Sequence, residues 1–246
     1  MRFSDDILHI APSPIKLAEE LAGWFYAQVT AHLEQNPNIY IAFSGGNSPI
    51  MFFRNIAEKY GKKIEWQRVH IFWADEKCVA PDHYDSNYYC ANKHLLSRIE
   101  IPEANIHRIH GENTDNEPKR YAHEILSIVP KYQEIPCFDL FFLGMGDDGH
   151  IASIFAGQNN VIFSGNIVEP SVDPRKDQKR ITITPYCINN SKKIIFNVSG
   201  LAKSAIVDAV INKKADQLEL PGLQIRPALG EMYWFFDIGA AQKLFV

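Results

Sequence analysis

The amino-acid sequence predicts an α/β protein built on an open, mostly parallel sheet with helices on both faces. The main observation is that short, apolar, β-rich runs alternate along the chain with longer stretches of helical periodicity. The second is size and composition: 246 residues, of which 46% are apolar and 22% charged, are enough for one large hydrophobic core. No linker-like stretch interrupts the chain, so we expect a single domain over residues 1–246.

The first half of the chain predicts strands that lead through turns into helices. Leu17, Leu21 and Val29 recur near helical spacing behind Pro14, which suits a first helical turn. The predicted elements of this half are a helix at 14–35, a strand at 38–43, a helix at 51–60, a strand at 68–74 and a helix at 88–99.

The second half continues the alternation and ends on a strand and a short helix. Its least regular part, residues 157–179, predicts a long loop or flap. The predicted elements are a helix at 117–132, strands at 138–144, 180–184 and 193–200, a helix at 201–211, a strand at 232–237 and a terminal helix at 238–245.

In open sheets of this kind, which are modified Rossmann-like arrangements, ligands bind beyond the carboxyl ends of the strands, at a switch point in strand order. The loops that follow strands are therefore the places to look for chemistry. They are residues 44–49, 74–87, 144–153 and 200–203.

Composition excludes several classes of protein. A net charge of −4 argues against a nucleic-acid binder, because such domains are usually basic, but it allows a small anionic ligand held by a few local cations. No apolar run approaches the roughly 20 residues of a membrane span, and the early acids at the N-terminus do not fit a signal peptide. The four cysteines are widely spaced, without a CxxC pair, which favours reduced thiols in a cytoplasmic protein over a metal site or a disulfide framework.

The segment "SGGNSP" (44–49) follows a predicted strand and precedes a helix. Ser44 offers a hydroxyl, Gly45 and Gly46 allow close backbone approach, and the helix behind them presents free N–H groups to an anion. A tight turn with a Ser or Asn cap explains the same residues without a ligand. The pattern is neither a Walker A loop nor GxGxxG, so it does not imply a nucleotide.

A polar segment, "DEKCVAPDHYDSNY" (75–88), follows the next strand. Asp75 is expected at the strand tip, and Lys77 is long enough to reach a phosphate or a carbonyl oxygen. Ser86 equally suits the cap of the following helix. His83, in an open polar loop, is better explained as a solvated residue than as a base.

The loop "GMGDDGH" (144–150) is the most specific feature. His150 lies two residues after Asp148 in a glycine loop at the end of a buried strand, and a histidine whose tautomer is fixed can take a proton from water. The alternative is a glycine turn whose histidine caps the next helix. His107 and His110 fit a surface turn.

Two further cations complete the candidate site. Arg180 opens "RITIT", and Lys203 lies in "GLAK" at the start of a helix. Each alone is better explained as a surface charge. Beside Lys77 and a helix N-terminus they would form a phosphate pocket in an otherwise acidic protein.

Four blocks in order, "FSGGNSP", "FWADEKCVAPDHYDSNY", "DLFFLGMGDDGHIASIFAG" and "RITITPYCINNSKKIIFNVSGLAK", resemble the 6-phosphogluconolactonases over roughly residues 10 to 240. The resemblance implies hydrolysis of 6-phospho-D-glucono-1,5-lactone to 6-phosphogluconate in the oxidative pentose phosphate pathway, with no metal or organic cofactor.

The resemblance also implies a role for each candidate residue. His150 is the general base, Asp148 orients it or grips a sugar hydroxyl, and Lys77 stabilises the oxyanion. The 6-phosphate is held by Ser44, Gly45, Gly46, Arg180 and Lys203. The candidates for the sugar hydroxyls or for framing the loop are Asp75, Ser86 and Asn87.

Two departures from the family pattern keep alternatives open. Lys77 stands where the lactonases usually carry arginine, and Ala156 replaces a proline. The glucosamine-6-phosphate deaminases share the fold, but their Asn-Glu-Pro element is "SIFAG" here, without the acid. A deaminase-like enzyme, a non-catalytic sugar-phosphate binder and a lactonase for a related lactone remain as alternatives, as do monomer and homodimer.

Overall fold

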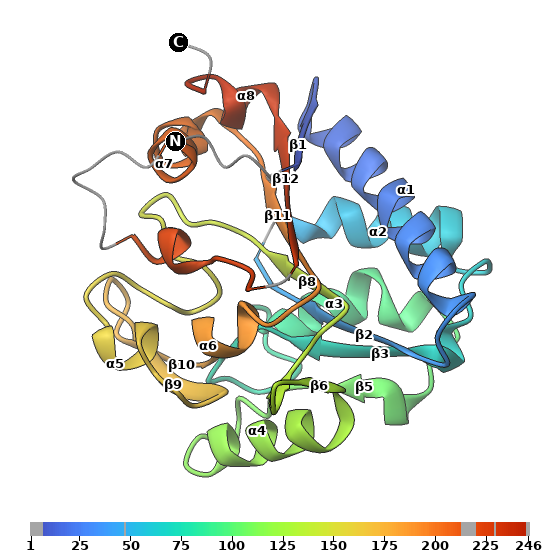
Figure 1. Cartoon of the computed structure of the whole chain (residues 1–246), viewed down its shortest axis with the longest axis horizontal. Helices are drawn as coiled ribbons and strands as arrows, with labels where there is room; N and C mark the ends of the chain where they lie inside the picture. The colour runs from blue at the N-terminus through green and yellow to red at the C-terminus, as the bar shows by residue number, and fades with distance from the viewer. Residues whose placement is uncertain (1–6, 47, 213–219, 229, 245–246) are drawn as a thin grey trace.

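The computed structural model describes residues 7–46, 48–212, 220–228 and 230–244, and its centre is a seven-stranded sheet (Figure 1). The strand order is β1-β12-β11-β8-β2-β3-β5, and every neighbouring pair is parallel. The prediction of an open, mostly parallel sheet is therefore confirmed. The strands are β1 (Ile7–Ala11), β2 (Ile39–Phe43), β3 (Val69–Trp73), β5 (Ile106–His107), β8 (Leu140–Leu143), β11 (Lys193–Val198) and β12 (Glu231–Asp237).

Helices cover the sheet on both sides. The first three helices pack in series along one side, with α1 against α2 and α2 against α3, while α4 and α6 lie on the other (Figure 1). The helices are α1 (Pro14–Leu33), α2 (Pro49–Tyr60), α3 (Asn87–His94), α4 (Glu117–Ile128), α5 (Asn159–Ile162), α6 (Pro185–Ile188), α7 (Ser204–Ile211) and α8 (Ile238–Ala241).

An aromatic cluster joins α1 and α2 to the middle of the sheet. The rings of Phe25, Phe43, Phe52 and Phe142 are fully or almost fully buried and contact one another at centroid distances of 5.2 to 6.1 Å. Burial of each ring contributes about 1.5–3 kcal/mol. Because Phe43 ends β2 and Phe142 lies next to the last residue of β8, this packing also fixes the ends of the two strands that lead into the candidate loops.

The switch point of the sheet lies between β2 and β8. From β2 the chain order runs outward through β3 and β5, and from β8 it runs the other way through β11 and β12. The loops after these two central strands therefore diverge and leave a crevice beyond their carboxyl ends. They are the loop that begins at Ser44 and the loop that begins at Gly144, both of which were predicted to bear the chemistry.

A second sheet, of three antiparallel strands, lies beside this crevice. It has the order β4 (Asp75–Lys77), β10 (Gln178–Ile183) and β9 (Val168–Asp173), and it pairs Lys77 with Arg180. The prediction of a long loop at 157–179 is wrong here, because α5, β9 and the start of β10 occupy about half of that segment. Pro170 obscured the strand in the sequence, and the structure places it on an edge strand, where proline is tolerated.

Other boundaries differ from the predictions for local reasons. Helix α4 ends at Ile128 and not at 132, because Pro130 forces the residue before it into an extended conformation. Lys131 and Tyr132 instead form β6, paired with β7 (Ile135–Pro136). The edge strands β1 and β5 were not predicted. Phe245, in the predicted terminal helix, lies outside the described residues.

His107 is not on a surface turn, as was predicted, but buried in β5. Its ring stacks on Phe72 at 4.3 Å, its Nε2 lies 3.0 Å from His70 Nδ1, and its Nδ1 lies 2.9 Å from Glu124 Oε1. Two residues of strand pairing with β3 are enough to draw this side chain under α4.

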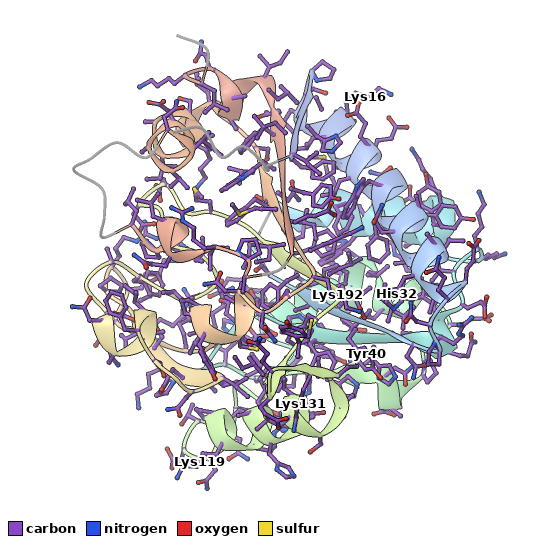
Figure 2. All side chains as sticks on the ribbon, in the orientation of Figure 1. Lys16, His32, Tyr40, Lys119, Lys131 and Lys192 are labelled. Carbon is purple, nitrogen blue, oxygen red and sulfur yellow. The ribbon has the colours of Figure 1, made fainter. Side chains whose placement is uncertain are left out.

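The amino end of the sheet is held by a buried carboxylate, away from the crevice. Asp139, just before β8, accepts bonds from the backbone N–H of Tyr40 at 2.9 Å and from Lys192 Nζ at 2.8 Å, and His32 Nε2 lies 3.6 Å from it. Tyr40, Lys192 and His32, which come from separate elements, are labelled in Figure 2. In the described ranges, no helix is long and apolar enough to cross a membrane.

Candidate active site

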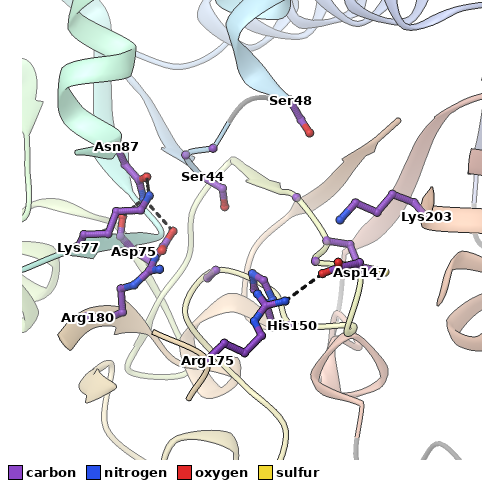
Figure 3. Close-up of a pocket in the computed structure, with 16 residues that line it drawn as sticks. Ser44, Ser48, Asp75, Lys77, Asn87, Asp147, His150, Arg175, Arg180 and Lys203 are labelled. Carbon is purple, nitrogen blue, oxygen red and sulfur yellow. Dashed lines mark hydrogen bonds and ion pairs between the residues drawn. The ribbon is translucent and has the colours of Figure 1, made fainter. Parts of the chain in front are cut away.

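A cavity of about 410 Å³, open to solvent, lies at the switch point (Figure 3). Its walls come from the loop after β2, the loop after β8, the β4–α3 segment, the β9–β10 hairpin and the short helical turn Leu201–Lys203. All the residues predicted for the site line this cavity except Asp148 and Ser86. Five segments that are distant in the sequence therefore meet where the chemistry was expected.

Asp148 and His150 form a hydrogen-bonded pair beside the cavity. The distance from His150 Nδ1 to Asp148 Oδ1 is 2.5 Å, and the backbone N–H of His150 donates to the same oxygen at 3.2 Å. Since an ionised carboxylate only accepts, Nδ1 carries the proton and Nε2 is left free as a base. The ring packs on Phe155 at 4.8 Å, which limits its rotation.

Gly146 makes room for this pair. A Cβ atom at Gly146 would overlap the His150 ring at Nδ1 and Cε1 and would come within 2.5 Å of Asp148 Oδ1. The glycine is therefore required by the close approach of the two side chains to the backbone of their own loop.

The electrostatic surroundings keep Asp148 ionised. Burial acts to raise the pKa of its carboxyl group, but the charge and hydrogen bonds of His150 and the charge of Arg175 outweigh it and hold the pKa below its ordinary value. Asp148 lies behind His150 and does not line the cavity, so the geometry favours the orienting role over contact with a sugar hydroxyl.

Asp75, Lys77 and Asn87 form a connected group on the opposite wall. Asn87 Nδ2 donates to the backbone oxygen of Asp75 at 2.8 Å and to its Oδ1 at 3.2 Å, and Asn87 Oδ1 accepts from Lys77 Nζ. Asp75 Oδ2 accepts from Ser153 Oγ at 2.6 Å, which ties this wall to the loop that carries His150. Asn87 therefore sets the position of the Lys77 ammonium group.

The hydroxyl group of Ser86 makes hydrogen bonds that support the site and does not line the cavity. Its hydroxyl caps α3 by accepting from the backbone N–H of Tyr89 and donates to Glu76 Oε2 at 2.9 Å. Glu76, which sequence reasoning did not single out, also accepts from the backbone N–H groups of Lys77, Asn87 and Tyr88, each at 2.8 Å. Burial raises the pKa of Glu76, while these backbone bonds and the charge of Lys77 oppose the rise.

Arg180 is buried in the wall next to Lys77. Its Nη2 donates to Asp173 Oδ2 at 3.0 Å, and its Nε, also buried, has no hydrogen-bond partner among the described residues. Arg180 lines the cavity, where its positive charge favours an anion.

The loop after β2 contributes hydroxyl and backbone groups. Ser44 Oγ donates to the backbone oxygen of Phe142 at 3.0 Å, which joins the two central loops. Gly45 lies against Asn87, so closely that a Cβ atom would overlap the amide group. Ser48, not predicted as a site residue, precedes α2 without forming a side-chain cap, and Figure 3 shows its hydroxyl directed into the cavity.

The third wall contains two residues that were not predicted, Asp147 and Arg175. Arg175 Nη1 donates to Asp147 Oδ1 at 3.1 Å, and the hydrogen bond from Arg175, with the nearby charge of Lys203, lowers the pKa of Asp147. The signal that could have identified Arg175 was its place in the segment predicted as a flap beside the site. Lys203 and Asp147 lie across the cavity from Lys77 and Arg180 (Figure 3).

The arrangement joins an oriented base to two separate groups of cations. It can remove a proton from a small nucleophile and stabilise negative charge at two positions. Within the described residues, no cluster of His, Cys, Asp and Glu is arranged to hold a metal ion.

Comparisons with known proteins agree with this geometry. Residues 12–234 match the model of the family described as glucosamine-6-phosphate isomerases/6-phosphogluconolactonase. The chain is 34% identical over 231 residues to a protein named 6-phosphogluconolactonase from Haemophilus influenzae, covering 93% of this chain and 94% of that one. It is 32% identical to the protein of the same name from Synechocystis, covering 88% and 89%.

The fold of the chain is also similar to that of a solved structure. The crystal structure of a 6-phosphogluconolactonase from Thermotoga maritima superposes with a TM-score of 0.83 at 26% identity, covering 94% of this chain and 99% of that one. The similarity in sequence and in fold thus extends over nearly the whole chain. The chain belongs to the glucosamine-6-phosphate isomerase/6-phosphogluconolactonase family.

Proposed function

We propose that this protein hydrolyses 6-phospho-D-glucono-1,5-lactone to 6-phosphogluconate, the step of the oxidative pentose phosphate pathway that its lactonase relatives are named for. The observation that carries the proposal is the Asp148–His150 pair facing a cavity whose other walls bear cations. A lactone is an activated acyl group, so a positioned base and charge stabilisation are enough to accelerate its hydrolysis.

In the proposed reaction, His150 Nε2 takes a proton from a water molecule while the water oxygen bonds to the lactone carbonyl carbon. The carbonyl oxygen becomes an oxyanion, which Lys77 and nearby backbone N–H groups stabilise. The bond from that carbon to the ring oxygen then breaks, and the protonated His150 returns its proton to the ring oxygen. Asp148 stays ionised throughout and holds Nδ1–H.

The phosphate of the substrate is proposed to bind Arg180, Lys203 and the Ser44–Gly46 loop. Arg180 lines the cavity, and its guanidinium charge favours it as a phosphate ligand. Lys203 lies on the other side of the cavity from Arg180, so the contact of each cation with the phosphate needs its own test. Kinetics of Arg180→Gln and Lys203→Gln separate these roles: loss of a phosphate contact raises KM, whereas loss of an oxyanion contact lowers kcat.

The alternative reaction, deamination of an amino sugar phosphate, is less well supported by the site. The deaminases carry an acid in the segment after the Gly-His loop, and this chain has the apolar "SIFAG" there, with Phe155 packed on His150. Release of ammonia from glucosamine 6-phosphate would reveal such an activity. A binder without activity would take up 6-phosphogluconate and leave the rate of lactone opening unchanged.

The decisive experiment uses freshly generated 6-phosphogluconolactone, coupled to 6-phosphogluconate dehydrogenase and NADP, with the spontaneous rate subtracted. We expect the wild type to accelerate hydrolysis and His150→Ala to lose about 10²–10⁴-fold in kcat, the usual contribution of a general base. A wild type without acceleration refutes the lactonase assignment. An active His150→Ala variant refutes the role of the base while leaving the reaction standing.

The remaining parts of the proposal concern the setting of the enzyme. The four cysteines are free thiols, which suits a reducing cytoplasm. We propose that the protein acts there as one domain, without a cofactor or a nucleic-acid partner, as a monomer or homodimer. Selectivity for the gluconolactone over a related lactone is tested by comparing kcat/KM for the two.

A further inference from the structure

Arg175 lies on the turn between β9 and β10 and reaches across to the loop that carries the base (Figure 3). Its Nη1 lies 3.1 Å from Asp147 Oδ1 and 3.4 Å from Asp148 Oδ2. Both carboxylates belong to the loop that follows β8, so this one guanidinium group connects the hairpin of the small sheet to the glycine loop of the main sheet.

The contact divides the two oxygens of Asp148 between two partners. Oδ1 accepts from the ring and the backbone N–H of His150, and Oδ2 faces Arg175. A carboxylate held at one oxygen can still turn about its Cβ–Cγ bond. When both of its oxygens are held, the Asp148 carboxylate presents a fixed acceptor to His150 Nδ1. The orientation of the imidazole ring is then fixed as well.

Arg175 is itself held from behind by a buried acid. Asp173 Oδ1 accepts from the backbone N–H of Arg175 at 3.0 Å and lies 3.8 Å from its Nε, while Asp173 Oδ2 accepts from Arg180 at 3.0 Å. Asp173 is 2% exposed, so its position does not depend on solvent. Arg175 is therefore placed by the same carboxylate that orients Arg180.

We propose that Arg175 is a positioning residue for the base, acting through Asp148 rather than by touching the substrate. This inference rests on the proposed function for its kinetic test. Arg175 is about half exposed, and an exposed ion pair by itself contributes little to stability, so its expected effect is on the geometry and protonation of the pair.

The change Arg175→Gln is expected to lower kcat about ten-fold and to leave KM within about two-fold, because a misplaced base costs less than a missing one. Removing a positive charge beside the Asp148–His150 pair also lets the pair bind a proton more readily. The acid limb of the kcat profile should therefore move to higher pH. Arg175→Lys, which keeps the charge but not the planar fork, should recover part of both losses.

Two variants serve as controls. Lys179→Gln removes an equal charge from the exposed face of the same hairpin, away from the cavity, and should leave kcat and the pH profile unchanged. Asp147→Asn removes the negative charge from the other contact of Arg175, so a smaller loss than that of Arg175→Gln is expected if the role runs through Asp148. A purely structural role of Arg175 would lower the melting temperature without moving the acid limb.

A rise in KM at constant kcat for Arg175→Gln would overturn the proposal and make Arg175 a substrate ligand. No change in either constant would overturn it as well. Carboxyl carbon NMR of Asp148 during a pH titration tests the same contact without turnover: its midpoint should move up in Arg175→Gln, and an unmoved midpoint refutes the inference. If the wild type lacks lactonase activity, the function fails and this titration still decides the role of Arg175.

Discussion

Replacing Gly146 with alanine tests whether the geometry of the Asp148–His150 pair controls the rate. The added Cβ would overlap the His150 ring and press on Asp148 Oδ1. In the described chain, the positive-φ glycines are at other positions, so the backbone at Gly146 accepts alanine without strain of its own. The perturbation is therefore steric and falls first on the side chains of His150 and Asp148.

The expected magnitude follows from the size of the overlap. His150 and Asp148 are both partly exposed, so they can relax outward by about 1 Å, and the added methyl group should cost about 1 kcal/mol of unfolding free energy. A displacement of about 1 Å at a catalytic group costs about 10²-fold in rate. We therefore expect Gly146→Ala to fold and to lose about 10²-fold in kcat.

The assay is coupled lactone hydrolysis, with thermal unfolding measured on the same preparation. Gly144→Ala is the matched comparison, because it lies in the same loop and a Cβ there meets nothing within 4 Å. Any effect of that change comes from space taken from the cavity and should appear in KM. A folded Gly146→Ala variant with kcat within three-fold of the wild type would refute the reasoning.

Glu76→Gln should lower the unfolding free energy by about 2–3 kcal/mol in urea, because an amide cannot accept all four bonds that the carboxylate accepts; an unchanged midpoint would contradict this. Lys77→Met should lower kcat about 10²-fold while Lys77→Arg stays within ten-fold, as expected for an oxyanion donor, and an active Lys77→Met variant moves that role elsewhere. Burial and the charge of His107 lower the pKa of His70 below 6.5, so the unfolded chain binds the proton first and stability should fall as the pH drops below 6.5. His70→Gln should flatten this dependence between pH 7 and 5, and an identical slope in both proteins would show that another group causes it.

Much of the main sheet could be predicted because its strands are buried on both faces. Runs such as Leu140–Leu143 are continuously apolar, and their lengths and flanking glycines separate them from helices. The edge strands lacked this signal. Two of the five residues of β1 are exposed, and β5 contains two residues, so neither strand produces a pattern that stands out from a loop.

The part of the candidate site that could be predicted is the part formed within a single loop. Asp148 and His150 are two residues apart, so their contact is local and the glycines around them were an adequate signal. Ser86 was predicted either to contact the substrate or to cap a helix. The structure favours the cap, because the hydroxyl of Ser86 caps α3 and donates to Glu76. Glu76 itself was overlooked because a buried acid and a solvated one look the same in a sequence.

The contribution of the β9–β10 hairpin could not be predicted, for a reason that bears on how the site works. Arg175 meets Asp148 only because the antiparallel sheet is placed against the parallel one, and that placement depends on register between segments about a hundred residues apart, such as Lys77 with Arg180. The base follows a strand of one sheet, and Lys77, Arg175 and Arg180 belong to the other. A change in how the two sheets pack would therefore alter the protonation of the base without touching any residue of the glycine loop, and the pH profile of kcat is the measurement most sensitive to it.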